Sequence, residues 1–170
     1  MNIDNFTESD VEMKIIYPLL TDSQPEGLGY NEYNIQTKAS LKKILIDKGS
    51  SQKLYYPDFA ITISGVPLVI IEAKKPKEDL DEAYRQASLY ASELNREYPS
   101  KANPCNLVIA CNGEALYAGN IDTNKPEFKI KTSDWLTTNP DFDNFLKIFN
   151  LIKLEKDAQI FRSKLRTEAK

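Results

Sequence analysis

The middle of the chain holds two apolar runs joined by a short turn. Residues 55–63 and 66–73 are rich in β-branched and aromatic side chains, and a Ser-Gly pair between them favours a hairpin turn. This pattern predicts two antiparallel strands. The second run ends in charged side chains, Glu72 and Lys74, and Pro76 stops it. Carboxylate and ammonium groups therefore stand at the end of a strand whose body is apolar.

Two other segments have the spacing of amphipathic helices. Residues 9–20 place apolar side chains on one face, and Ser9 with Glu12 predicts a capping box at the helix start. Pro18 is expected to kink or shorten the last turn. Residues 77–98 repeat small and aromatic side chains at helical spacing, which suits packing of a helix on a sheet. These positions are Leu80, Ala83, Tyr84, Ala87, Tyr90, Ala91 and Leu94.

The remaining segments add strands and a helical tail. Strand patterns occupy residues 33–38, 106–110, 115–120 and 128–135; the second is apolar throughout and is predicted to be central, and the last is predicted to be an edge. Residues 41–54 fit either a further strand and loop or a short helix. The chain from residue 141 onward is expected to be helical. This order predicts an α/β sandwich, a central mixed β-sheet flanked by helices.

Length and composition favour one main domain. The chain has 170 residues, of which 41% are hydrophobic and 28% charged, enough for a sizeable core. Residues 1–150 are expected to form the domain, and 151–170 a charged helix or a linker toward a downstream domain. No apolar run approaches the ~20 residues of a membrane helix. The acidic N-terminus lacks a signal-peptide pattern, so a cytoplasmic protein without a membrane partner is predicted.

Composition also narrows the chemistry. The chain has no histidine, which excludes Ser-His-Asp hydrolases, Cys-His proteases, zinc deaminases and histidine-metal nucleases. Catalysis must then use carboxylates, lysines, tyrosines or a hard metal ion. The net charge is −3, whereas a domain that holds DNA by its own phosphate contacts is usually basic. Contact with nucleic acid would be weak without a metal ion, a local basic patch or neighbouring domains.

Chemically useful side chains converge at one end of the predicted hairpin. Asp58 stands near the start of the first strand, which in an antiparallel pair lies beside the end of the second, next to Glu72. Glu72 and Lys74 are two residues apart and share a face. A hard divalent cation relieves the repulsion of paired carboxylates, and a nearby lysine can orient water or offset charge on a phosphate. The ordinary alternative is a surface ion pair of Asp58 with Lys74, worth ~1 kcal/mol or less.

These residues, with two more on the predicted helix, resemble a known family. In chain order they are Pro57-Asp58, Glu72-Ala73-Lys74 and, four apart, Gln86 and Tyr90. The set resembles the PD-(D/E)xK nuclease motif with its Q-x-x-x-Y extension. The stretch IIEAKKP, followed by an acidic helix and RQASLYA, is similar to the N-terminal nuclease domain of the R (motor) subunit of type I restriction enzymes. The resemblance covers roughly residues 7–120 and implies a restriction-endonuclease-like fold.

The resemblance implies Mg²⁺-dependent hydrolysis of DNA phosphodiester bonds, with roles for the matching residues. Asp58 and Glu72 would ligate Mg²⁺, or Mn²⁺ in its place, and the Ala73 carbonyl would be a third ligand. Lys74 would position or activate the attacking water. Each of these expected roles belongs to a residue of this chain that matches the family motif.

Four further residues extend the predicted site. A glutamate from the first helix often joins such sites, and Glu8 and Glu12 are both candidates; Glu12 has the competing capping role, and Glu8 fits the opening of such domains slightly better. Gln86 and Tyr90 would contact DNA or steady the site from the second helix. Their ordinary alternatives are a solvent-facing position for Gln86 and core packing for Tyr90.

Basic residues near the site favour DNA contact only weakly. Lys75 and Lys77 extend the basic edge beyond Lys74. The sequence supports two explanations of these lysines about equally: contact with a DNA phosphate, and a solvated strand end. The C-terminal stretch with Arg162 and Arg166 is better explained as a solvated face or linker than as a DNA-binding surface.

The implied partners are double-stranded DNA, a motor domain, and methyltransferase and specificity subunits. The chain has no G-x-x-x-x-G-K-[ST] phosphate loop and hence no ATP site of its own. It is either the nuclease part of a longer subunit or a free-standing relative. Two rival functions remain open: an inactive module of the same fold for DNA positioning or subunit docking, and an α/β binding domain without a nucleic-acid role.

Overall fold

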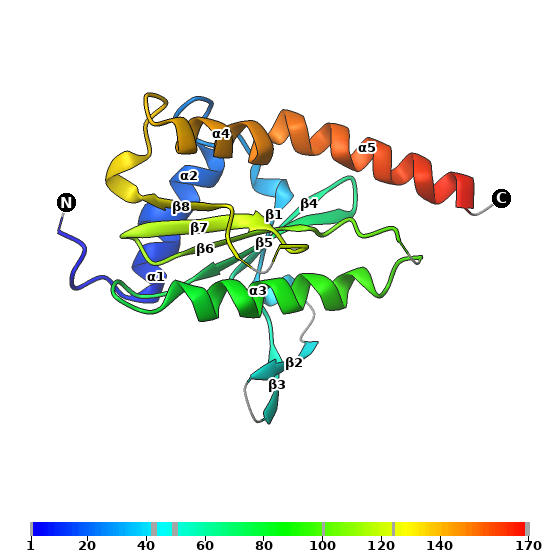
Figure 1. The fold of residues 1–170 in the computed structure, drawn as a ribbon, viewed down its shortest axis with the longest axis horizontal. Coiled ribbons are helices and arrows are strands. Elements are labelled where there is room, and N and C mark those ends of the chain that lie inside the picture. Colours follow the sequence, from blue (N-terminus) through cyan, green and yellow to red (C-terminus); the bar gives the residue numbers. More distant parts are fainter. Residues whose placement is uncertain (1, 42–43, 49–50, 100, 124, 169–170) are drawn as a thin grey trace.

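Figure 1 shows the computed structural model of the chain, which describes residues 2–41, 44–48, 51–99, 101–123 and 125–168. A six-stranded mixed sheet forms the middle layer. Helix α3 (Leu80–Asn95) covers one face, and helices from the two ends of the chain cover the other. This is the α/β sandwich predicted from the order of the elements. None of the described helices is long and apolar enough to cross a membrane.

The sheet places its two most buried strands in the centre. The strand order is β1 (Ile35–Thr37), β4 (Phe59–Ile63), β5 (Val66–Ala73), β6 (Leu107–Cys111), β7 (Ala115–Asn120) and β8 (Phe128–Lys131). Within it β5 and β6 run parallel, and the other neighbouring pairs run antiparallel. The predicted central strand, β6, and the predicted edge strand, β8, are both confirmed. All five residues of β6 are buried, because helices cover both faces of the sheet there.

The β4–β5 hairpin turns where the sequence predicts. Ser64 and Gly65 have φ values of 53° and 78°, the positive values that a type I′ hairpin turn requires. The first strand is shorter than predicted, because Tyr55 closes an earlier strand and β4 begins only at Phe59. Pro57 between them has no N–H to donate, so the strand ladder is interrupted at this point.

Residues 41–54 contain a second hairpin, which decides between the two structures that the sequence left open. It consists of β2 (Ile44–Lys48) and β3 (Ser51–Tyr55), which pair antiparallel as a separate two-stranded sheet. Residues 42–43 and 49–50 lie outside the described part. In Figure 1 this hairpin projects away from the six-stranded sheet on the side of α3. Its last residue, Tyr55, brings the chain back to the sheet just before β4.

The first helix begins at Glu8, one residue before the predicted range of residues 9–20. It consists of α1 (Glu8–Val11), a π-helical turn η1 (Glu12–Ile16) and α2 (Tyr17–Thr21). The predicted capping box of Ser9 and Glu12 is wrong: Thr7 caps the helix, its hydroxyl accepting the Asp10 N–H at 3.1 Å while Asp10 accepts the Thr7 N–H at 3.0 Å. Both pairs have the required spacing, and the earlier one is used. Glu12 is therefore not a capping residue. The helix continues through Pro18.

Helix α3 buries the face that its sequence period predicts. Asp79 caps the helix by accepting the Asp81 N–H at 2.9 Å. The small residues of this face let the helix lie close to β5 and β6. The predicted positions that are buried are Leu80, Ala83, Tyr84, Ala87, Tyr90 and Ala91, while Leu94 is half-buried.

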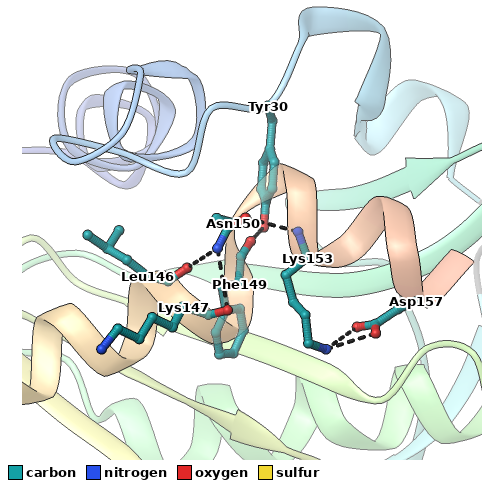
Figure 2. A network of polar contacts seen from close by, with 7 residues as sticks. All are labelled: Tyr30, Leu146, Lys147, Phe149, Asn150, Lys153 and Asp157. Carbon is teal, nitrogen blue, oxygen red and sulfur yellow. Dashed lines mark hydrogen bonds and ion pairs between the residues drawn. The ribbon is translucent and has the colours of Figure 1, made fainter.

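The chain ends in two helices that meet at a hydrogen-bonded joint. In Figure 2, Asn150 between α4 (Pro140–Phe149) and α5 (Leu151–Glu168) accepts the Lys153 N–H at 2.9 Å and donates to the Leu146 carbonyl at 2.8 Å. The Tyr30 hydroxyl donates to the Phe149 carbonyl at 2.6 Å. The helical tail is as predicted, and α5 also buries three side chains in the main core: Leu154, Ala158 and Phe161. A domain boundary at residue 150 stays a prediction.

Candidate active site

Three neighbouring strands bring charged residues together at one end of the sheet. In the middle strand Phe59 lies opposite Thr37 of β1 and opposite Ile71 of β5. Continuing both pairings by one residue gives a row across the three strands, which consists of Lys38, Asp58 and Glu72. The hairpin argument from the sequence covers the second and third of these. The first depends on the pairing of β1 with β4, which the sequence does not reveal.

A carboxylate from the first helix joins this row. Glu8, Asp58 and Glu72 each offer a carboxylate oxygen, and the three atoms lie within 4.8 Å of one another. Glu8 is the first residue of α1, Asp58 directly precedes β4, and Glu72 lies near the end of β5. Packing of the first helix beside the sheet therefore adds a third acid to the two that the hairpin brings together.

Asp58 is held from two sides. It is 3% exposed, and its Oδ2 accepts the Ala73 N–H at 2.6 Å. Its Oδ1 lies 2.6 Å from Lys38 Nζ. The hydrogen bond to the Ala73 amide fixes the orientation of the carboxylate, so that Oδ1 is the oxygen turned toward a cation.

Glu72 is buried beside a tyrosine and a lysine. It is 5% exposed, its Oε2 accepts a hydrogen bond from the Tyr55 hydroxyl, and its Oε1 lies 3.9 Å from Lys74 Nζ. Burial, followed by the charge of Asp58, raises the pKa of Glu72 to about 8, although Tyr55 and Lys74 lower it. At neutral pH this carboxyl is poised to hold a proton unless another cation compensates its charge.

Both glutamates of the first helix lie near Asp58. Burial, then the charge of Asp58, raises the pKa of Glu8. Burial, followed by the neighbouring Asp58 carboxylate, raises the pKa of Glu12 to about 7. The Lys38 Nζ lies 3.5 Å from Glu12 Oε1. Of the two glutamates, Glu8 shares the three-oxygen cluster, while Glu12 faces Asp58 and Lys38.

Comparison with known proteins assigns the chain to a family. Residues 30–127, more than half of the chain, match the family described as type I restriction enzyme R protein N terminus. The chain belongs to this family. The matched region contains Lys38, Asp58, Glu72 and Lys74, whereas Glu8 of the first helix lies outside it.

A curated protein of the same kind is also similar. It is the putative type I restriction enzyme MjaVIIIP endonuclease subunit of Methanocaldococcus jannaschii, which is 32% identical over 104 residues. The aligned part is 59% of this chain and 9% of that protein, so the chain spans a small share of its relative. No solved structure gave a significant match.

In this member of the R protein N-terminal family, the end of β5 continues its pairing with β6 beyond the strand. The Lys74 N–H donates to the Cys111 carbonyl at 2.9 Å, which fixes the backbone between Glu72 and Lys74. The Lys74 side chain is 25% exposed and lies beside Glu72. A ligand role of the Ala73 carbonyl stays a prediction.

Gln86 and Tyr90 of α3 differ in how they relate to the carboxylates. Tyr90 is fully buried and sets its ring edge-on to Tyr55, with 5.8 Å between the ring centroids; Tyr55 in turn donates to Glu72. Tyr90 thus supports the site through one intermediate residue. Gln86 is buried too, which excludes the solvent-facing alternative, and its Nε2 donates to Glu82 at 3.3 Å.

Lys75 and Lys77 lie outside the cluster. Both side chains are exposed, and Lys75 Nζ lies 3.9 Å from Glu78 Oε1. Their contact with DNA stays a prediction.

Sequence reasoning missed two residues of the site, Lys38 and Tyr55. Each had a local signal: Lys38 ends a predicted strand, and Tyr55 stands shortly before the Pro-Asp pair. Neither signal identifies a partner, because Lys38 reaches Asp58 through the β1–β4 pairing and Tyr55 reaches Glu72 across the end of the sheet.

The donor set fits a hard divalent cation. The clustered ligands are carboxylate oxygens, and no His or Cys belongs to the group found among the described residues. Mg²⁺ and Mn²⁺ prefer oxygen ligands, whereas Zn²⁺ is usually held by nitrogen and sulfur. Burial, followed by the charge of Asp58, raises the pKa values of Glu8 and Glu72, and an added divalent charge would act in the opposite direction.

Proposed function

We propose that the chain is the Mg²⁺-dependent DNA endonuclease domain of a type I restriction-modification system. The observation that carries the proposal is the cluster of Glu8, Asp58 and Glu72, whose oxygens lie within 4.8 Å in a chain of the R protein N-terminal family. Crowded, buried carboxylates are costly unless a cation or proton compensates them. A bound Mg²⁺ would supply the positive charge that compensates these carboxylates.

The residues of the site have two roles, metal binding and orientation of the attacking water. Asp58, Glu72 and Glu8 hold the ion, with the Ala73 carbonyl as a further ligand and Mn²⁺ as a substitute. When bound, Mg²⁺ supplies positive charge that stabilises the negative charge developing on the scissile phosphate. Lys74 donates from beside Glu72 to orient the attacking water.

The surroundings keep these groups in place. The Ala73 amide orients Asp58, and Tyr55 occupies one oxygen of Glu72. Tyr90 packs behind Tyr55 and acts as a support for the site. Buried partners that fix the catalytic side chains in advance favour the reaction, because these side chains then need little rearrangement during it.

DNA binding by the chain alone is expected to be weak and sensitive to salt. The net charge is −3, and the basic contribution near the site comes from a few lysines such as Lys74, Lys75 and Lys77. A motor domain, with methyltransferase and specificity subunits, would hold the DNA in the assembled enzyme. Cutting by the isolated chain should therefore be slow or absent.

The test is plasmid cutting by the assembled enzyme with the wild-type chain or with Asp58→Asn. Cutting should fall by roughly a hundredfold or more in the variant, with Asp134→Asn, an exposed carboxylate on η4 (Thr132–Asp134), as the matched control. A wild-type chain that assembles and supports DNA binding without cutting would instead identify an inactive positioning or docking module. Equal cutting by wild type and Asp58→Asn would overturn the site.

A further inference from the structure

Lys38 lies where a divalent cation would meet Asp58. Asp58 uses Oδ2 for the Ala73 amide, which leaves Oδ1 as the oxygen turned to a cation. The Lys38 ammonium lies 2.6 Å from this oxygen and 3.5 Å from Glu12 Oε1. One lysine thus compensates Asp58 of the cluster and the neighbouring Glu12, and it meets Asp58 at the atom that a metal ion would need.

Lys38 differs from the carboxylates in how firmly it is held. The side chain of Asp58 is 1% exposed, whereas that of Lys38 is 45% exposed. It extends from a short 3-10 turn, η3 (Lys38–Ser40), and a lysine stem has four flexible carbon–carbon bonds. The ammonium can therefore swing into solvent while the acids stay in place.

An ammonium and a divalent ion cannot comfortably share this site. At a separation of a few ångströms their repulsion in a partly buried site amounts to several times the thermal energy. Binding of the ion therefore requires that Lys38 leave Asp58 Oδ1.

We propose that Lys38 is a resident counter-cation of the carboxylate cluster, which neutralises Asp58 in the metal-free chain and is displaced when the divalent ion binds. The inference rests on the proposed metal-dependent function and adds a control of metal affinity to it. Lys38 lowers the affinity for the ion, because its own contact must be broken first. It also prevents the empty cluster from destabilising the fold.

The first test is calorimetric titration of the 170-residue chain with MnCl₂ at pH 8.5, where protons compete least for the carboxylates. Lys38→Met keeps the length of the side chain without its charge. It should bind Mn²⁺ roughly tenfold more tightly than wild type, the factor expected for one charge-assisted hydrogen bond. Lys14→Met is the matched control, because Lys14 pairs with Asp10 at 3.5 Å outside the cluster and its loss changes the net charge equally.

A second variant, at the same position, is expected to change the affinity for Mn²⁺ in the opposite direction. Lys38→Arg keeps the positive charge and offers a planar fork that suits a carboxylate better. It should hold Asp58 more firmly and bind Mn²⁺ more weakly than wild type. Because this variant retains the ion pair, it also serves if Lys38→Met does not fold.

Thermal unfolding distinguishes a counter-cation role of Lys38 from a purely structural role. In EDTA, Lys38→Met should unfold at a lower temperature than wild type, and Mn²⁺ should raise its Tm by more than it raises that of wild type. A structural role alone would lower Tm equally with and without Mn²⁺, and this result would overturn the proposal.

The outcomes also distinguish this proposal from the proposed function. If wild type binds Mn²⁺, Asp58→Asn abolishes that binding, and Lys38→Met binds no more tightly than wild type, the metal site stands and the role of Lys38 is overturned. If neither wild type nor Lys38→Met binds Mn²⁺, both proposals fail.

Discussion

Lys38 and Asp58 face each other across the edge of β1 and β4, with 2.6 Å between Nζ and Oδ1. With Glu72 they form a row at the end of three neighbouring strands, in which Lys38 and Asp58 lie one residue beyond the paired residues Thr37 and Phe59. The paired backbones of these strands fix where each residue of the row leaves the sheet, because each strand positions its neighbour. The chemistry of this row can be tested by removing one group at a time.

Metal binding should depend on Asp58. The isolated chain is expected to bind Mg²⁺ and Mn²⁺ through oxygen ligands and to hold Zn²⁺ only weakly. Asp58→Ala removes a buried ligand at the centre of the cluster and should reduce Mn²⁺ affinity below detection in a calorimetric titration. Wild type and variant binding Mn²⁺ with equal affinity would count against the site.

Lys74 should matter for cutting and little for folding. Its side chain is 25% exposed and lies at a strand end, so Lys74→Ala opens no core cavity. In the assembled enzyme the variant should lose plasmid linearisation, while the thermal unfolding of the chain shifts by no more than about 1 kcal/mol in stability. Lys147→Ala on α4, whose lysine pairs with Asp143 at 3.1 Å, is a suitable control. Cutting at the wild-type rate would make Lys74 an ordinary surface lysine.

The Tyr55 hydroxyl should be needed to hold Glu72 as a ligand. Tyr55→Phe keeps the ring that packs against Tyr90 and removes the donor to Glu72 Oε2. The buried carboxylate then loses its partner, so Mn²⁺ affinity should fall by roughly five- to tenfold, and stability by about 1–2 kcal/mol. Calorimetry and denaturant unfolding measure the two effects. Tyr33→Phe, at a tyrosine that is 82% exposed, should change neither, and an unchanged Tyr55→Phe would exclude a positioning role.

Stability without metal should fall as the pH rises through the range in which Glu72 titrates. Burial and Asp58 raise its pKa from 4.5 to about 8, so between these values the folded chain keeps a proton that the unfolded chain has released. The protonated form is the stabilising one, and its contribution is therefore complete below pH 4.5 and lost by about pH 8.

Glu72→Gln tests this dependence, because the amide resembles the protonated acid at every pH. In EDTA between pH 5 and 9, the variant should lose less stability than wild type, with a difference on the order of 1–3 kcal/mol. Denaturant unfolding across this range is the measurement, and Glu155→Gln on the exposed side of α5 is the control. Parallel curves for wild type and Glu72→Gln would contradict the raised pKa.

Local patterns in the sequence were sufficient for much of this protein. Two apolar runs and a Ser-Gly turn determine the β4–β5 hairpin, and the hairpin alone brings Asp58 to Glu72, since an antiparallel turn places the start of the first strand beside the end of the second. The period of small residues likewise determines which face of α3 is buried. These features depend on residues that are close in the chain.

Tertiary structure decided the rest of the site. The sequence predicted a cap at Ser9 and left open which of two glutamates of the first helix joins the site. The Thr7 cap and the packing of this helix beside the sheet brought the Glu8 oxygen into the three-acid cluster. Lys38 and Tyr55 reach their carboxylates through the β1–β4 pairing and across the sheet end. Such contacts depend on how separate elements dock. Docking is set by the fit of whole buried surfaces, and a local pattern of residue types does not record it.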